Sequence, residues 1–300
     1  MAGNVLSKIN KRQNLMKIKN SRKYNVSLPD NRILTWYESG PEQGKPVLFC
    51  TGAGMSGLLG VEVDLLSKLN IRLITPTRPG LGDSTFDPKK SLKSFSEDIL
   101  FLLDHLRIKN INVMGFSQGA VFAMALCVYC HVDKLLIVAG QDQFDDPDTQ
   151  NKLTDDVVNM QRQAVGAPDL LTSWIKQNIT AKWLIDFILN YSADVDLAIY
   201  KSVDFLPVYQ ECMAEAFKQG NDGYTQDLLI AMQPWGFSPE EIKTPTTLWY
   251  GMKDTSTVHS PDFGDLLFQR FPNAERHLWP EEGGSLLWTK TEEILLELVD

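Results

Sequence analysis

Cysteine is scarce in this sequence, with four residues in a chain of 300, which excludes a scaffold held together by disulfides. Cys127 and Cys130 form a C-x-x-C pair, but the second pair or spaced histidine that a metal site would need is missing. We therefore interpret both as thiols inside a buried helix. Long apolar runs are missing too, since the longest, residues 120–130, is about half of what a membrane-spanning helix requires.

An excess of positive charge is also absent, because the net charge is −9, and this disfavours binding of nucleic acid. The first thirty residues lack the apolar core of a secretory signal, so we expect a cytoplasmic protein. Residues 1–23 nevertheless hold seven Lys or Arg and no acid. We interpret this segment as a solvated, flexible extension. A transit peptide is disfavoured, because such peptides are rich in Arg and Ser rather than in Lys and Asn.

Short apolar runs alternate with helical spacing along the rest of the chain, which predicts a mostly parallel sheet with helices on both faces. An opening hairpin at residues 24–37 adds an antiparallel edge. The region from 150 to 235 is helical throughout, and it follows the carboxyl end of a strand, where lids over active sites are built. We therefore expect a core of residues 24–144 and 238–300 with a helical cap at 145–237. The strands are expected at 24–28, 33–37, 46–51, 71–75, 111–114, 134–139, 246–250 and 275–279.

The sharpest motif is Gly115-Phe116-Ser117-Gln118-Gly119. A G-x-S-x-G pattern alone occurs often by chance. Here it directly follows an apolar strand and directly precedes an apolar helix, and this strand–turn–helix context is what holds a nucleophilic serine in a strained, exposed conformation. The alternative, a glycine-rich turn whose serine has no role, does not explain both flanks.

These residues resemble the nucleophile elbow of the α/β-hydrolase fold superfamily, in particular bacterial-type serine hydrolases with a helical cap. Three further stretches match that family in order: an oxyanion loop at 49–54, an R-P-G-x-G-x-S turn at 78–84, and a G-x-x-D loop at 251–254 that carries the triad acid. The resemblance covers about residues 24–300. It implies a mostly parallel eight-stranded sheet and a cap of four or five helices.

The chemistry of an acyl transfer assigns roles to these residues. Ser117 would attack an acyl carbon, and the N–H groups of Gln118 and Ala53 would stabilise the oxyanion. Gly52 and Gly54 would bring the loop backbone close to the substrate. Asp254 would orient a histidine. Asp142 and Asp145, which follow the strand at 134–139, are a second possible position for the acid.

The sequence lacks a histidine at the position where the family carries the triad base, because Gly284 stands there. Four histidines exist, and only His259 and His277 follow Asp254. His277 lies in a strand, ~20 Å along an extended chain from position 284. His259 lies five residues after Asp254, at the start of the next predicted helix. It is either a surface histidine near a helix cap or a substitute base. Glu282 or the substrate itself could also serve as the base. We expect Gly284 to leave a gap the size of an imidazole ring.

Two classes of function follow. One is a serine hydrolase, esterase-like, with a substitute base; the other is a non-hydrolytic protein that binds a small molecule in the same pocket. The retained elbow, oxyanion loop and Asp254 favour the enzyme. The aromatic, Met-rich helical region favours a small apolar or amphipathic acyl substrate. We expect no cofactor and no metal, because phosphate loops, dinucleotide fingerprints and metal-ligand clusters are missing from the sequence. Nothing in the pattern defines an oligomeric state.

Overall fold

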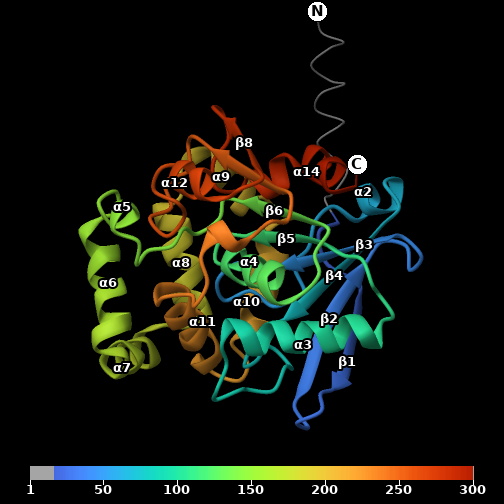
Figure 1. The fold of residues 1–300 in the computed structure, drawn as a ribbon, viewed down its shortest axis with the longest axis horizontal. Coiled ribbons are helices and arrows are strands. Elements are labelled where there is room, and N and C mark those ends of the chain that lie inside the picture. Colours follow the sequence, from blue (N-terminus) through green and yellow to red (C-terminus); the bar gives the residue numbers. More distant parts are fainter. Residues whose placement is uncertain (1–16, 300) are drawn as a thin grey trace, which may run out of the picture.

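The computed structural model describes residues 17–299, in which eight strands form one twisted sheet in the order β1-β2-β4-β3-β5-β6-β7-β8 (Figure 1). Strand pairs β1–β2 and β2–β4 are antiparallel and the five other pairs are parallel, as predicted. The strands are β1 (Arg22–Ser27), β2 (Ile33–Ser39), β3 (Lys45–Cys50), β4 (Ile71–Thr77), β5 (Asn112–Phe116), β6 (Lys134–Val138), β7 (Thr246–Gly251) and β8 (Ala274–Trp279).

Two apolar cores lie on the two faces of this sheet, because its central strands are buried on both sides. One face is covered by α2 (Val63–Lys68), α13 (Leu286–Thr289) and α14 (Thr291–Val299). The opposite face is covered by α3 (Leu92–His105), α4 (Gly119–Tyr129) and α12 (Asp265–Arg270). The chain after β8 thus forms two helices in succession, α13 and α14, whereas α12 is a single short helix of six residues.

Seven helices lie between β6 and β7 in a stretch that the structure describes throughout, so the family-based expectation of four or five was too low. Helices α5–α7 lie at the left of Figure 1, far from β1. A single turn of 3-10 helix, η1 (Pro239–Glu241), leads back into the sheet. The seven are α5 (Pro147–Gln150), α6 (Asp155–Gly166), α7 (Pro168–Asn178), α8 (Ala181–Tyr191), α9 (Asp194–Tyr200), α10 (Leu206–Ala216) and α11 (Asp222–Met232).

The end of the basic N-terminal segment is not a flexible extension, which corrects the boundary expected at residue 23. Ile18 is buried at 1% exposure, and its carbonyl accepts a hydrogen bond from Gly60 N. The Asn20 amide donates to the Gly57 carbonyl at 2.8 Å and to Thr75 Oγ1 at 3.0 Å. The buried side chain of Ile18 and the hydrogen-bonded polar groups hold residues 17–23 against the core, although most of these residues are charged. Residues 1–16 lie outside the described part of the chain.

The Cys127–Cys130 pair lies at the end of α4, where neither thiol forms a disulfide. Burial raises the pKa of both thiols to about 12. Thiols of this kind stay protonated at neutral pH and are poor nucleophiles or metal ligands. The interpretation of the pair as structural thiols is consistent with this environment.

Parallel strands bring their carboxyl ends to one edge of the sheet, and this edge gathers the sequence-predicted site residues. The registers pair Cys50 with Gly115, Phe116 with Val138, and Val138 with Trp249. The loops that follow β3, β5, β6 and β7 therefore emerge side by side.

Candidate active site

Ser117 occupies a strained turn between β5 and α4. Its φ angle is +53°, in the left-handed region that side chains other than glycine rarely adopt. Its backbone N–H donates to the Val138 carbonyl at 3.1 Å, which fixes the turn on β6. Both motif glycines are required by close packing. A Cβ atom at Gly115 would lie 2.7 Å from Ala120 Cα, and one at Gly119 would lie 2.1 Å from the Cys50 carbonyl oxygen.

A chain of hydrogen bonds links Ser117, His259 and Asp254. Ser117 Oγ lies 2.9 Å from His259 Nε2, and His259 Nδ1 lies 2.6 Å from Asp254 Oδ2. With the ring proton on Nδ1, the imidazole donates to Asp254 and its Nε2 accepts the hydroxyl proton of Ser117. All three side chains are almost buried, so solvent screens these contacts little.

Asp254 and His259 lie on the same loop, the one that follows β7. Ser256 N donates to Asp254 Oδ1 at 2.9 Å, which leaves Oδ2 free for the histidine. Ser260 N donates to the Gly140 carbonyl at 2.9 Å and so ties the other end of the loop to the edge of the sheet. His259 is therefore not a surface histidine: it is 7% exposed, and its ring packs edge-on against Phe116.

Asp142, at the second possible position for the acid, has hydrogen-bond partners other than His259. Asp142 is buried at 1% exposure and accepts from Gln143 N at 2.7 Å and from the Ser260 hydroxyl at 3.2 Å. Burial raises the pKa of Asp142 to about 6. Within the described residues, His259 has no hydrogen bond to Asp142 or to Asp145. Of the three candidate acids, only Asp254 thus forms a hydrogen bond with His259.

The gap expected at Gly284 does not exist. A Cβ atom there would lie 2.8 Å from Asp254 Oδ1, so the Asp254 carboxylate itself fills the space. The N–H groups of Gly284 and Ser285 donate to the Asp196 carboxylate of α9 at 3.1 and 2.7 Å. This loop therefore binds the helical region of residues 145–237. The Glu282 carboxylate, another candidate base, lies 3.5 Å from Lys290 Nζ.

Two backbone N–H groups remain free beside the elbow. In the described part of the chain, neither Gln118 N nor Ala53 N donates a hydrogen bond to another protein atom. Gln118 stands at the N-terminus of α4, where the helix dipole favours negative charge. The Ala53 loop packs on the helical region, because a Cβ atom at Gly54 would lie 2.9 Å from Leu184 and from Phe217.

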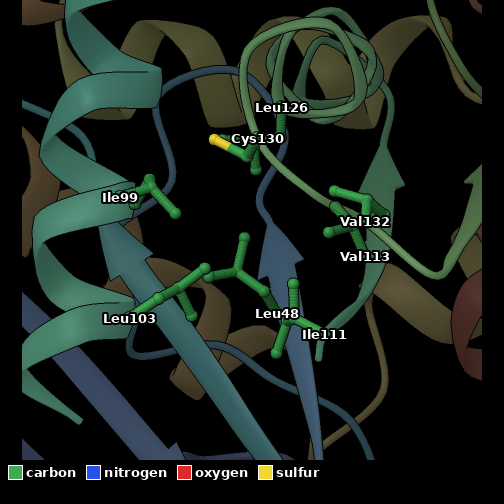
Figure 2. Close-up of a pocket in the computed structure, with 8 residues that line it drawn as sticks. All are labelled: Leu48, Ile99, Leu103, Ile111, Val113, Leu126, Cys130 and Val132. Carbon is green, nitrogen blue, oxygen red and sulfur yellow. The ribbon is translucent and has the colours of Figure 1, made fainter. Parts of the chain in front are cut away.

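Two hollows that the structure outlines lie away from Ser117. The one in Figure 2 is an apolar void with no room for a water molecule, bounded by side chains of β3, α3, β5 and α4 such as Leu48, Ile99 and Leu126. A wider hollow of about 380 Å³ lies by β1, β2 and the end of α3. A cavity between Ser117 and residues 145–237 stays a prediction; Ser117 itself is 8% exposed.

Comparisons with known proteins agree with this architecture. A family model described as the alpha/beta hydrolase fold matches residues 45–174. A hydrolase from Pseudomonas aeruginosa superposes with a TM-score of 0.68 over 93% of this chain and 98% of that one, at 15% sequence identity. The chain therefore has the α/β-hydrolase fold.

Other proteins that are similar to this chain carry different functions in their names. A bromoperoxidase from Bacillus anthracis superposes with a TM-score of 0.67 over 93% of this chain and 99% of that one, at 20% identity. The magnesium-chelatase 30 kDa subunit of Rhodobacter capsulatus is 30% identical over 117 residues. That match covers 37% of this chain and 41% of the relative, so less than half of the relative is spanned. Because one fold supports many reactions, the function must be argued from the site.

Two kinds of feature are absent from residues 17–299, a metal-binding cluster and a membrane-spanning helix. No cluster of three or more His, Cys, Asp or Glu side chains in residues 17–299 is arranged to hold a metal ion. Among the helices of the same residues, none has the length and apolar character needed to cross a membrane.

Proposed function

We propose that this chain is a serine hydrolase that acts on an ester or a related acyl substrate. In this proposal Ser117 is the nucleophile, His259 is the general base, and Asp254 orients the histidine and stabilises its charged form. The observation that carries the proposal is the pair of hydrogen bonds at 2.9 and 2.6 Å that joins the three side chains. The hydrolases among the structural neighbours support the broader assignment to a hydrolase.

The reaction would run in two halves. His259 Nε2 takes the Ser117 proton as Oγ attacks the acyl carbon, and the N–H groups of Gln118 and Ala53 donate to the oxygen that becomes negative. Collapse of the tetrahedral intermediate expels the alcohol, which receives the proton from His259. Water then attacks the acyl-enzyme with the same base, releasing the acid and restoring Ser117.

The unusual feature is that the acid and the base share one loop. The order serine, acid, histidine along the chain is kept, but the base stands after β7 instead of after β8. Geometry and role, rather than sequence position, define such a triad. The position of His259 therefore removes the main argument for a non-catalytic binding protein, which was the missing base at Gly284.

The helical region of residues 145–237 is proposed to act as the cap, and the substrate to be small and apolar or amphipathic. Apolar side chains of this region, Leu184, Met213 and Phe217, pack on the oxyanion loop at Gly54. An acyl group bound beside that loop would meet hydrocarbon and aromatic surface. Gly52 and Gly54 would face the substrate through their backbone.

Active-site labelling tests the proposal directly. A fluorophosphonate probe should label the wild-type protein, and mass spectrometry should place the adduct on Ser117. The Ser117→Ala variant should not be labelled and should not hydrolyse p-nitrophenyl acetate or butyrate. A folded wild-type protein that neither reacts with the probe nor turns over these esters would instead be a small-molecule-binding protein that has kept the elbow.

A further inference from the structure

Arg78, from the turn after β4, is buried at 1% exposure beneath the oxyanion loop. Its guanidinium donates from Nη1 to the Thr51 carbonyl at 2.5 Å and from Nη2 to the Gly52 carbonyl at 2.8 Å. Nε donates to Asp227 Oδ2 of α11 at 2.7 Å. The guanidinium also lies 4.8 Å from the centre of the Phe122 ring in α4. One side chain thus touches the loop, the helix that begins at the elbow, and the helical region of residues 145–237.

The hydrogen bond from Arg78 to the Gly52 carbonyl affects the direction of the Ala53 N–H group. The Gly52 carbonyl and the Ala53 N–H belong to the same peptide unit, which is trans and planar, so the two groups point in opposite directions. When Arg78 holds the carbonyl on its own side, the Ala53 N–H is turned away from Arg78. That N–H is free of protein acceptors in the described residues. The loop itself lies against the elbow, since a Cβ atom at Gly119 would be 2.5 Å from the Thr51 oxygen.

We propose, on the basis of the function proposed above, that Arg78 is a positioning residue for the oxyanion hole. By holding the carbonyls of Thr51 and Gly52 it sets the plane of the 52–53 peptide, and so aims the Ala53 N–H at the oxyanion that forms on Ser117. A fixed donor stabilises the transition state without reorganisation, whereas a peptide free to rotate does not. The planar fork of arginine can hold two carbonyls at once, which the single ammonium of lysine does less rigidly.

The same buried cluster contains a matched control. Lys90 Nζ lies 2.6 Å from Asp227 Oδ1 and donates to the carbonyls of Pro79 and Gly223, and within the described residues it makes no hydrogen bond to residues 51–54. Arg78→Met and Lys90→Met therefore each remove one buried cation and leave the other cation paired with Asp227. They remove the same charge, but only the first releases the oxyanion loop.

The test compares kcat and KM for p-nitrophenyl butyrate in Arg78→Met, Arg78→Lys and Lys90→Met, with melting temperatures to establish folding. We expect Arg78→Met to lower kcat by about 10²-fold with KM changed less than about threefold, since loss of one oxyanion donor costs about 10²–10³. Lys90→Met should lower kcat by less than about threefold, and Arg78→Lys should lie between the two. Binding of a trifluoromethyl ketone, which forms a tetrahedral adduct, should weaken in parallel with kcat.

Three outcomes would overturn the inference. Equal losses of kcat in Arg78→Met and Lys90→Met would mean that the cluster only stabilises the fold. Full activity of a folded Arg78→Lys or Arg78→Met would mean that the 52–53 peptide is set by other contacts. A wild-type protein without esterase activity or probe labelling would remove the proposed function, and this inference with it.

Discussion

Gly284 lies against the carboxylate of Asp254, so that a Cβ atom added to the glycine would be 2.8 Å from Oδ1 and 3.0 Å from Cγ. The position at which the family resemblance predicts a histidine is thus filled by the carboxylate of Asp254, the acid of the proposed triad. On the other side, Gly284 N donates to Asp196 of α9. A histidine cannot be accommodated here without moving the group that it would need as a partner.

Substitution of Gly284 should therefore lower activity, whereas the gap expected there from the sequence would predict a gain from Gly284→His. Either Gly284→Ala or Gly284→His should displace Asp254 from His259, and we expect kcat for p-nitrophenyl esters to fall by between about 10-fold and 10³-fold. Gly166→Ala is the control, because nothing lies within 4 Å of a Cβ atom there. A faster Gly284→His enzyme would show that this loop can still supply the base.

Removal of the imidazole should nearly abolish turnover. His259→Ala should lower kcat by about 10⁴-fold or more, because Ser117 then has no group to accept its proton. Added imidazole should restore part of the rate by occupying the vacated space. His131→Ala is the control, since the His131 side chain is 77% exposed. Unchanged turnover in a folded His259→Ala protein would refute the role of this histidine.

Stability should depend on pH through Asp142. Burial raises its pKa to about 6, so the folded state favours the protonated acid. The contribution of this group to stability is therefore full below pH 4 and is lost as the pH rises through about 6. Asp142→Asn should remove that loss and raise the free energy of unfolding at pH 8, relative to wild type, by on the order of 2–3 kcal/mol.

Urea unfolding of both proteins at pH 5 and pH 8 measures this effect. The asparagine keeps an oxygen for Gln143 N and gains an N–H group for Ser260, so the local hydrogen bonds can be preserved. The neighbouring charges are Asp262, which also accepts from Ser260, and Arg270. A stability difference between the two proteins that is the same at both pH values would contradict the assignment.

The N-terminal segment should contribute to stability through Ile18. Ile18→Ala should cost about 2–4 kcal/mol of unfolding free energy, as for other buried aliphatic side chains, and lower the melting temperature by roughly 5–10 °C. Lys19→Ala removes only a half-exposed ion pair with Glu211 and should cost less than about 1 kcal/mol. Equal melting temperatures for the two variants would mean that this segment does not dock in solution.

Part of the site can be read from local sequence because its residues are neighbours in the chain. Gly115, Ser117 and Gly119 lie within five consecutive residues, and the strand and helix around them have clear periodicities. The observed φ of +53° at Ser117 is the conformation that this pattern predicts. The same reasoning applies to the Asp254 loop, which directly follows a buried strand.

The partners of His259 could not be read in this way. A histidine five residues after an acid is common on protein surfaces, and its side chain can point to solvent or to the sheet with equal local preference. The direction is set by contacts distant in sequence, such as Ser260 N on the Gly140 carbonyl and the His259 ring against Phe116. The docking of Ile18 was missed for a similar reason, because one buried side chain among lysines leaves no periodic signal.

By itself, the sequence determines the alternation of strands and helices, the mostly parallel sheet and the elbow that holds Ser117, because these follow from periodic apolar residues and from glycines whose packing is local. Only the tertiary structure places His259 between Ser117 and Asp254, fills the space at Gly284 with the Asp254 carboxylate, and brings Arg78 beneath the Gly52 carbonyl. These contacts join loops and helices that are separated in the chain by up to 149 residues, as in the Arg78–Asp227 pair. Such contacts form only where the whole sheet aligns the ends of its strands.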